Sequence, residues 1–492
     1  MRLYINNHSF HYECENLVRV FFPNLKITVE REQKALIAPY VATTVTNSEI
    51  IVTVKIDEFE QTLTAPKQDS DAKNEIAMAQ MIYKLLCSQS GADQPWGILT
   101  GVRPIKLIKS LRETYGNKKA GDYFINSLYV TPQRTSLAMH TERNQRAIVD
   151  SSGNNSFSLY ISIPFCPGRC NYCSFVSQSI EAAKHLMLPY TDLLCKEIKK
   201  TGKIAAQYGL KLQTVYIGGG TPTSLEDAYL AKILQAVNDN FDMVACREFT
   251  VEAGRPDTIT QEKLQILKNA GVDRISINPQ TLNDELLEKI GRNHTAQQFF
   301  DSYALARQIG FKAINVDLIA GLTDDTYENF CSTFDQIANL NPENITIHTL
   351  CLKRSSTLAE SHLQLQRESA ALCGKMLDYA AKQLKQTNYY PYYLYRQSRM
   401  VGNFENTGYC RQRHEGLYNI FIMDETHTIL SCGAGAVTKI KDPKTGNIER
   451  IFNFKYPYEY INRYAQMLER KDEAAEFFEK LQAEQGNTSV FE

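Results

Sequence analysis

The chain has 492 residues, of which 43% are hydrophobic and 22% are charged, and its net charge is −1. A chain of this length suggests about three domains, and its composition is typical of a globular protein. The balanced charge excludes a globally basic nucleic-acid-binding protein.

No apolar run approaches the length of about 18 residues that a membrane-spanning helix needs. The start, MRLYINNHSFHYE, lacks the basic and apolar pattern of a secretory signal. Of the twelve cysteines, nine are scattered singly along the chain. This usage is typical of a reducing compartment, so we expect a cytoplasmic protein.

Residues 1–150 are predicted to form an accessory domain with strands first and helices after them. Apolar, β-branched runs continue to Thr64. Helical periodicity begins near Ser70, with apolar residues such as Met78 and Ile82 on one face. Trp96, the only tryptophan, lies in the segment QPWGILTGVRP. We expect it to anchor packing between domains. Arg103 and Lys106, nearby, could bind an anion, although they could equally be charged side chains exposed to solvent.

Residues 155–365 are predicted to form the core. Six β-rich runs alternate with helical segments, at 157–164, 214–218, 248–253, 274–279, 313–319 and 344–350. Strand–helix units in series indicate a parallel sheet covered by helices. Six units are too few for a closed eight-stranded barrel. The predicted fold is therefore α/β, a partial (β/α)6 barrel with its active groups at the carboxyl ends of the strands.

Three cysteines follow the first run, in the segment YISIPFCPGRCNYCSF. Cys166, Cys170 and Cys173 have the spacing C-x3-C-x2-C. Thiolates suit iron–sulfur clusters and zinc. A structural zinc needs a fourth ligand, yet no histidine lies within ten residues of the triplet, and Cys195 lies 22 residues beyond Cys173. We expect a four-iron cluster with one open iron. A structural zinc site and inert thiols are the alternatives.

Glycines and polar residues also occur at the other strand ends. They are Gly219, Gly220 and Thr221 after the second run, Glu252 at the end of the third, Gln280 after the fourth with Arg292 beyond it, and Asp317 within the fifth. Each polar side chain could merely bind a neighbouring loop. Several of them on one rim indicate a cofactor pocket.

Residues 366–492 are predicted to form a mixed α+β domain that covers the substrate. An amphipathic helix comes first, followed by the segment YYPYYLYRQSRM, which is rich in tyrosine and arginine. Asp424 and Glu425 are predicted to form a turn between two apolar strands. The tail at 458–482 has helical periodicity.

The cysteine motif, with the aromatic Tyr172 before its last cysteine, resembles that of the radical S-adenosylmethionine (SAM) superfamily. Within it, the order of YISIPFC, GGGTP and the polar residues above is most similar to the oxygen-independent coproporphyrinogen III dehydrogenases, also called oxidases. The segments QPWGILTGVRP and PYYLYRQSRMVGNFENTGY resemble the HemZ-type branch, which extends the resemblance over most of the chain.

The resemblance implies a 4Fe–4S cluster on Cys166, Cys170 and Cys173, with one or two molecules of S-adenosylmethionine. The implied contacts to that cofactor are Tyr160, Tyr172, Gly219, Gly220, Thr221, Glu252, Gln280, Arg292 and Asp317. A 5′-deoxyadenosyl radical would remove a β-hydrogen from a propionate of coproporphyrinogen III, and loss of CO2 and one electron would leave a vinyl group. Two rounds would give protoporphyrinogen IX. An exposed cluster of this kind implies an anaerobic setting.

The implied partners are a tetrapyrrole substrate and a low-potential electron donor, a flavodoxin or ferredoxin, with neither nucleic acid nor membrane. A substrate with several carboxylates needs cations. Arg354, Arg396 and Arg399 are the candidates for these substrate contacts.

The chain departs from the best-studied members of the family at two positions beside the predicted centre. Ser162 replaces a histidine, and Phe175 replaces a further cysteine. These changes keep other tetrapyrrole enzymes as alternatives, namely a methyltransferase or an anaerobic haem-degrading enzyme. A non-catalytic haem chaperone is a third alternative, although the long segment before the cysteines argues against it.

Overall fold

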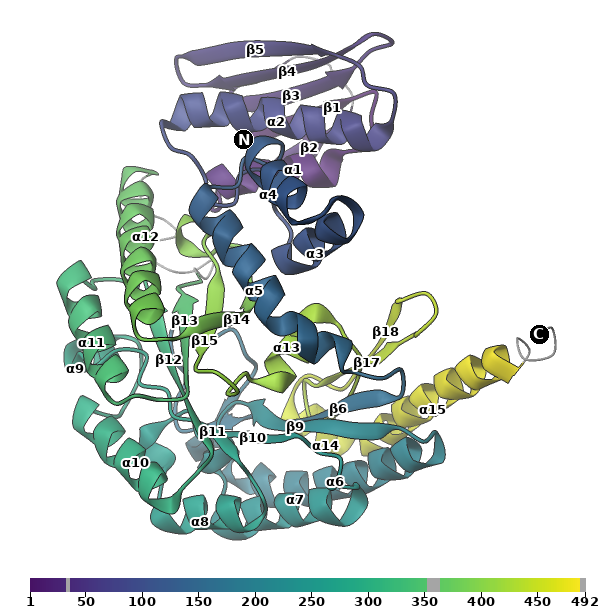
Figure 1. Ribbon diagram of the computed structural model, residues 1–492, viewed down its shortest axis with the longest axis vertical. Coiled ribbons are helices and arrows are strands. Elements are labelled where there is room, and N and C mark those ends of the chain that lie inside the picture. The colour runs from purple at the N-terminus through teal and green to yellow at the C-terminus, as the bar shows by residue number, and fades with distance from the viewer. Residues whose placement is uncertain (32–35, 352–362, 487–492) are drawn as a thin grey trace.

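The computed structural model of the protein describes residues 1–31, 36–351 and 363–486. Figure 1 shows a small sheet near the N-terminus and a large curved sheet, with helices between them. The small sheet has five strands and the large one eleven, and a two-stranded ribbon completes the described strands.

The N-terminal unit packs two helices on a five-stranded sheet in the order β2-β1-β3-β4-β5. In β4, the alternation of EIIVTVKI buries every second residue against the helices. The predicted helix begins after Ser70, whose side chain caps the backbone N–H of Lys73, and ends at Gly91 with φ +68°. The elements are β1 (Arg2–Asn6), α1 (His11–Phe21), β2 (Thr28–Glu30), β3 (Tyr40–Val45), β4 (Glu49–Ile56), β5 (Phe59–Pro66) and α2 (Asp71–Ser90).

Three helices connect this unit to the large sheet: α3 (Pro104–Tyr115), α4 (Asn117–Asn126) and α5 (Pro132–Asp150). Trp96 is fully buried, and its Nε1 donates to Glu405 Oε2 at 2.8 Å. Arg134 Nε lies 3.0 Å from the other oxygen of Glu405. The tryptophan therefore has the packing role that its sequence context predicts.

Six adjacent parallel strands form the core of the large sheet. They are β6 (Ser156–Ile163), β9 (Lys211–Gly219), β10 (Glu248–Glu252), β11 (Arg274–Ser276), β12 (Ala313–Ala320) and β13 (Asn344–Thr349). These correspond to the six runs expected from the sequence. β6 is buried along almost its whole length, as is usual for a parallel strand that is covered on both faces.

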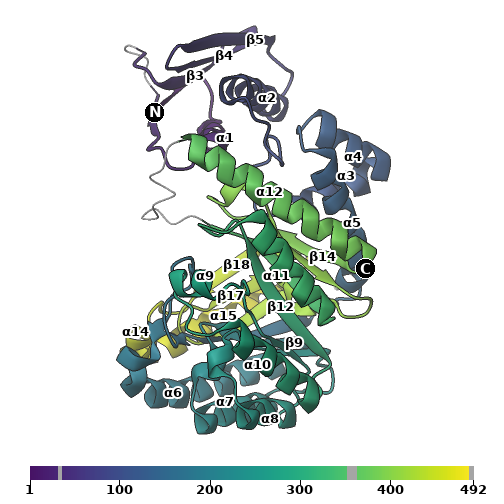
Figure 2. The same ribbon diagram turned by 90° about the vertical axis from the view of Figure 1, so that its left-hand side faces the viewer.

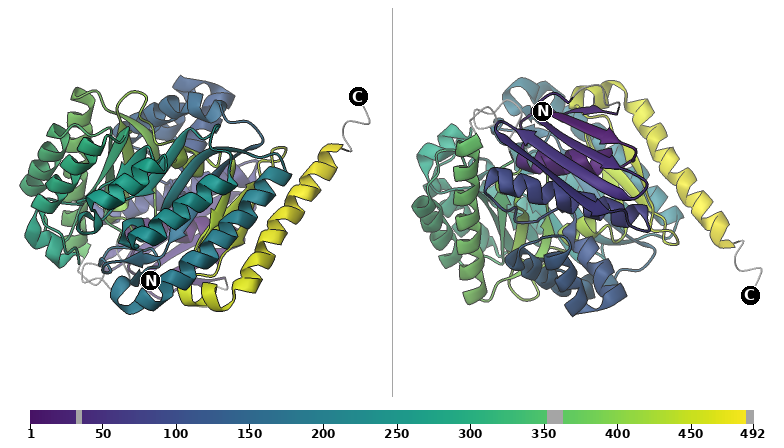
Figure 3. Two further views of the ribbon diagram at one scale, coloured as in Figure 1. Left: turned by 90° about the horizontal axis from the view of Figure 1, so that it is seen from below. Right: turned by 90° about the horizontal axis from the view of Figure 1, so that it is seen from above.

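The connecting helices cover the outer face of this sheet, as Figure 3 shows, and α11 and α12 lie side by side near β12 (Figure 2). The connecting helices are α6 (Ile180–Gln207), α7 (Asp227–Asn240), α8 (Gln261–Asn269), α9 (Asp284–Lys289), α10 (Ala296–Ile309), α11 (Tyr327–Asn339) and α12 (Leu363–Gln386). Among the described strands the two edges, β14 and β18, do not pair with each other. The predicted open, partial (β/α)6 core is confirmed.

The segment after α12 adds strands to both edges of this sheet. β15 pairs with β13, whereas β16 lies parallel to β6 on the opposite side. The segment therefore shares the hydrophobic core of the barrel. Its elements are β14 (Tyr390–Tyr395), β15 (Asn406–Cys410), α13 (Leu417–Asp424), β16 (Thr428–Cys432), β17 (Val437–Lys441), β18 (Ile448–Phe452), α14 (Pro457–Asn462) and α15 (Tyr464–Gly486).

The structure corrects one local prediction in this segment. The apolar run before the Asp424–Glu425 turn is the helix α13, not a strand. Glu248 on β10 accepts hydrogen bonds from the backbone N–H groups of Leu417 and Tyr418 at 2.8 and 3.1 Å. A carboxylate at a helix N-terminus stabilises the helix. The local sequence does not reveal this long-range cap, and a short apolar run by itself is compatible with either a helix or a strand.

Candidate active site

A cavity of about 550 Å³ lies at the carboxyl ends of the core strands. The three cysteines and all nine residues expected to contact the cofactor line it: Cys166, Cys170, Cys173, Tyr160, Tyr172, Gly219, Gly220, Thr221, Glu252, Gln280, Arg292 and Asp317. They come from five of the core strands, β6, β9, β10, β11 and β12, and from the segments that follow them. The fold thus brings together residues that span more than 150 positions of the chain.

The cysteine loop leaves β6 through the ribbon β7 (Phe165–Cys166) and β8 (Gln178–Ser179). The loop is anchored to the end of α9, because Asn171 donates its backbone N–H to Ile290 at 3.0 Å and its side chain to Lys289 at 2.7 Å. The backbone of Cys173 bonds to the carbonyl of Cys170 at 3.2 Å, which forms a turn. These bonds hold the loop against the cavity.

Two cysteine sulfurs receive hydrogen bonds from the protein. Thr221 Oγ1 donates to Cys166 Sγ at 3.4 Å, and Arg255 Nη1 lies 3.5 Å from Cys170 Sγ. Donors of this kind stabilise thiolate ligands. A Cβ atom at Gly220 would lie 2.6 Å from the carbonyl of Phe165 and 3.0 Å from Cys166 Sγ. Only glycine therefore leaves this sulfur in place.

The donor set fits a cluster with several irons. Within the described ranges, no three histidine, cysteine or acidic side chains converge on a site for one metal ion. Three sulfurs nevertheless line the same cavity. Cysteine thiolates are the ligands that hold such a cluster.

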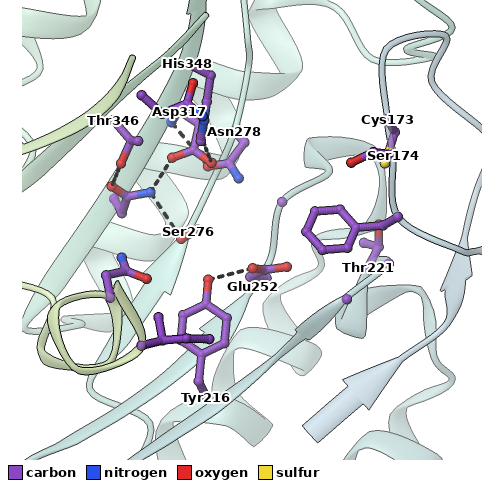
Figure 4. Close-up of a pocket in the computed structure, with 18 of the residues that line it drawn as sticks. Cys173, Ser174, Tyr216, Thr221, Glu252, Ser276, Asn278, Asp317, Thr346 and His348 are labelled. Carbon is purple, nitrogen blue, oxygen red and sulfur yellow. Dashed lines mark hydrogen bonds and ion pairs between the residues drawn. The ribbon is translucent and has the colours of Figure 1, made fainter. Parts of the chain in front are cut away.

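Glu252 lies at the centre of the cavity in Figure 4, between Tyr216 and Thr221. Tyr216 donates its phenol proton to Glu252 Oε1 at 2.5 Å. Burial raises the pKa of Glu252 to about 7; the bond from Tyr216 opposes this shift and the charge of Asp317 adds to it. A positively charged ligand beside Glu252 would favour its ionised form.

Asp317 lies among other polar side chains, including Asn278, Thr346 and His348, as Figure 4 shows. Asn315 Nδ2 donates to Asp317 Oδ1 at 2.6 Å, and His348 Nε2 lies 3.5 Å from Oδ2. Gln280 has φ +70° and bonds to the backbone of β12 on both sides. Its buried Oε1 has no hydrogen-bond partner within the described chain. A buried acceptor without a partner suits a ligand that donates a hydrogen bond.

Arg292 has most of its donors bound within the protein. Its Nη1 donates to the carbonyls of Gly254 and Asn278 at 2.8 and 2.9 Å. Nε and Nη2 both donate to the phenol oxygen of Tyr172, at 3.1 and 2.9 Å. This arginine thus fixes the aromatic residue between the last two cysteines against the strand ends.

Aromatic rings form the far side of the cavity. The rings of Tyr216 and Tyr418 stack at 4.4 Å between centroids, and Tyr160 lies 6.3 and 6.1 Å from them. Tyr393 and Tyr395 of β14 line the cavity as well. Tyr418 could not be singled out from the sequence, because its helix has the pattern of a strand and reaches the cavity only through tertiary packing.

Neither of the two expected substrate arginines that the structure describes lines this cavity. Arg354 lies outside the described residues. Arg396 is buried, its Nη1 and Nη2 donate to Leu99 and Asn403 at 2.6 Å, and its guanidinium lies over the ring of Trp96. Arg399, half-buried with φ +66°, does not line the cavity either. Arg396 thus packs the connecting segment against β14, and it is not among the residues that line the cavity.

Across the described chain, no helix combines the length and apolarity that crossing a membrane requires.

Residues 160–337 match the model of the Radical SAM superfamily. The chain is 33% identical over 491 residues to the oxygen-independent coproporphyrinogen-III oxidase-like protein HemZ of Bacillus subtilis, which covers 97% of this chain and 98% of the relative. It is 39% identical over 197 residues to the heme chaperone HemW of the same organism, and this alignment covers 40% of this chain and 51% of HemW.

A solved structure of coproporphyrinogen III oxidase (HemN) from Escherichia coli has the same core fold. It superposes with a TM-score of 0.50 and 23% identity, over 65% of this chain and 71% of the enzyme. Full-length similarity, the superfamily match and the shared fold agree. The chain belongs to the radical SAM superfamily and, within it, to the family of oxygen-independent coproporphyrinogen-III oxidase-like proteins typified by HemZ.

Proposed function

We propose that this chain oxidatively decarboxylates propionate side chains of coproporphyrinogen III to vinyl groups. Each propionate loses a hydrogen atom from its β-carbon, CO2 and one electron, which passes to an acceptor. Two such rounds give protoporphyrinogen IX. One observation carries the proposal: a single cavity is lined by the cysteine triplet and by a wall of tyrosines. Such a cavity can hold a cluster and a flat ligand side by side. The full-length similarity to HemZ supports the substrate class.

In this proposal Cys166, Cys170 and Cys173 hold a 4Fe–4S cluster and leave one iron for S-adenosylmethionine. When bound, the cluster and this cofactor supply reductive cleavage of a carbon–sulfur bond and a carbon radical that removes hydrogen from the substrate. Thr221 and Arg255 donate to the ligand sulfurs.

Backbone and side chains around the triplet would orient S-adenosylmethionine. Gly219 has φ +104°, and a side chain there would lie against Ser162, so glycine permits close approach of a ligand to the backbone. Glu252 would accept from a cationic or hydroxyl group of the cofactor, and the free Oε1 of Gln280 would accept a second hydrogen bond. Asp317, held by Asn315 and His348, would present a fixed carboxylate.

The remaining lining residues would exclude water. Tyr160, Tyr216 and Tyr418 fill one wall with stacked rings. A dry wall protects a reactive radical from quenching by stray hydrogen donors. Burial raises the pKa of each of these phenols above its usual value, so the wall stays uncharged.

Three further points belong to the proposal. A low-potential flavodoxin or ferredoxin would supply the electron, the protein would act in the cytoplasm, and either one or two molecules of S-adenosylmethionine would bind. Equilibrium binding of labelled S-adenosylmethionine to the reconstituted protein counts the molecules directly.

The test is anaerobic reconstitution with iron and sulfide, followed by incubation with S-adenosylmethionine, a reductant and coproporphyrinogen III. We expect vinyl products together with 5′-deoxyadenosine. If the products are methylated or ring-opened tetrapyrroles instead, the chain catalyses one of the other radical reactions and not decarboxylation. No tetrapyrrole product, despite cofactor cleavage, would contradict the proposal.

A second candidate is haem binding without turnover. It is favoured by the 39% identity to the heme chaperone HemW over 197 residues. That similarity covers only 40% of this chain and 51% of HemW, whereas the similarity to HemZ covers 97% of this chain. Tight haem binding with no decarboxylation in the same assay would favour this candidate.

A further inference from the structure

The basic side chains that line the cavity differ in whether the protein already binds their nitrogen atoms. Arg274 Nε lies 3.2 Å from Glu248, and Arg255 Nε lies 3.1 Å from Asp257. Arg292 is bound by Tyr172 and two carbonyls. His348 faces Asp317. These four groups are therefore held by the protein itself.

Lys439 is the exception. It lines the cavity from β17, is half-buried, and has neither an ion pair nor a hydrogen bond from its Nζ within the described residues. In β17 the burial alternates, and Val437 and Lys439 lie on the side that lines the cavity. Lys439 pairs with Ile429 of β16, which lines the cavity too. The strand thus delivers an uncompensated ammonium group to the tyrosine-lined end.

The carboxylate that acts on Lys439 is already bound by other cations. Glu425 contacts Arg103 Nη1 at 2.5 Å, Lys106 Nζ at 2.8 Å and Arg450 Nη2 at 3.1 Å. Burial lowers the pKa of Lys439 from its usual value, and the charge of Arg103 lowers it further. The protein therefore leaves this lysine in a site that favours an anionic ligand.

The surroundings of Lys439 carry an excess of positive charge. Six cations lie where α3, α13 and the β17–β18 hairpin meet, and two carboxylates act on them: the cations are Arg103, Lys106, Lys109, Lys439, Lys441 and Arg450, and the carboxylates are Asp424 and Glu425. Arg103, Lys106 and Lys109 come from the segment before the core. Their positive potential would draw a polyanion toward this end of the cavity.

We infer that Lys439 binds a carboxylate of the substrate and fixes its orientation at the tyrosine-lined end of the cavity. The inference rests on the proposed function, because it takes a tetrapyrrole with several carboxylates as the ligand. It also gives the segment before the core a role, since its cations help to form the basic surroundings. Lys439 lines the cavity, whereas Arg396 and Arg399 do not.

The test measures binding of coproporphyrin III, a stable fluorescent analogue with the same four carboxylates, to anaerobically reconstituted protein. The variants are Lys439→Met and Lys439→Arg. The control is Lys312→Met, because Lys312 has a side chain that is 78% exposed and precedes β12 at the edge opposite the cavity. Iron content and thermal melting of each variant establish that the fold and the cluster are intact.

We expect Lys439→Met to weaken binding about tenfold, the loss of one charge-assisted hydrogen bond. Its affinity should also depend less on salt, because one ion pair is lost. Lys439→Arg should retain binding within about threefold of the wild type, since it keeps the charge, and Lys312→Met should bind like the wild type.

Equal binding by the wild type and Lys439→Met would overturn the inference and leave the proposed function standing. Lys439→Arg binding as weakly as Lys439→Met would also overturn it, because charge would not be what the site recognises. If the wild type itself fails to bind coproporphyrin III, both the inference and the proposed substrate class fall.

Discussion

Arg255 Nη1 lies 3.5 Å from the sulfur of Cys170, and its Nε is held 3.1 Å from Asp257. A buried positive charge therefore lies beside one of the three sulfurs that we expect to bind the cluster. The contact between Arg255 and Cys170 connects the loop after β10 to the cysteine loop. It also means that a residue outside the cysteine motif can influence the cluster.

We predict that Arg255→Met lowers the midpoint potential of the cluster. A nearby cation and an N–H···S bond stabilise the reduced, more negative form, so their removal makes reduction harder. The potential is measured by redox titration monitored by electron paramagnetic resonance. Arg247→Met, an arginine bound to Ser151 near the surface, is the control and should leave the potential unchanged. An unaltered potential in Arg255→Met would mean that this contact has no electronic role.

A second prediction concerns pH. Burial raises the pKa of Glu252 from 4.5 to about 7, and Tyr216, Asp317, the backbone of Gly219 and His348 also act on it. Because the folded pKa lies above the unfolded one, the folded state holds this proton more tightly. The free energy of unfolding of the ligand-free protein should therefore fall as the pH rises between these two values.

Glu252→Gln should remove this part of the pH dependence, as measured by urea unfolding at a series of pH values. Glu328→Gln, at an exposed carboxylate, should keep the wild-type dependence. If Glu252 contacts S-adenosylmethionine, affinity for the cofactor should also rise as the pH passes about 7 in the wild type. Parallel curves for wild type and Glu252→Gln would contradict this account.

Gly220 should be intolerant of a side chain. A Cβ there would lie 2.6 Å from the carbonyl of Phe165 and 3.0 Å from Cys166 Sγ, so Gly220→Ala should displace the ligand and reduce the iron bound after reconstitution. Gly101→Ala is the matched control, because a Cβ at Gly101 meets no atom within 4 Å. Normal iron content in Gly220→Ala would show that the loop adjusts without cost.

The contact between Trp96 and Glu405 should contribute measurably to stability. Trp96→Phe removes the indole donor and should lower the free energy of unfolding by about 1 kcal/mol. Glu405→Ala also removes the buried carboxylate beside Arg134 and leaves that arginine paired only with the exposed Asp378, so it should cost about 3 kcal/mol. Urea denaturation measures both, with Tyr115→Phe on an exposed ring as the control. A smaller loss in Glu405→Ala than in Trp96→Phe would contradict this assignment.

The sequence predicted the parallel core well because each of its strands is a local apolar run followed by a helix. Cys166, Gly220 and Glu252 could be placed because residues at the carboxyl ends of parallel strands share one rim. Lys439 could not be placed at the cavity from the sequence, because it reaches the cavity only through the pairing of β16 with β6 and of β17 with β16. The contacts of Arg396 could not be predicted either, because its neighbours in the sequence are tyrosines, whereas its contacts are Trp96 and backbone carbonyls distant in the chain.

The central claim is that Cys166, Cys170 and Cys173 hold an iron–sulfur cluster that cleaves S-adenosylmethionine. The most direct test is metal and sulfide analysis of protein purified without exposure to air, combined with an assay for 5′-deoxyadenosine. We expect about four irons per chain and reductant-dependent 5′-deoxyadenosine, both lost in Cys166→Ala. Protein that contains zinc but no iron, or a Cys166→Ala variant that still cleaves the cofactor, would contradict the claim.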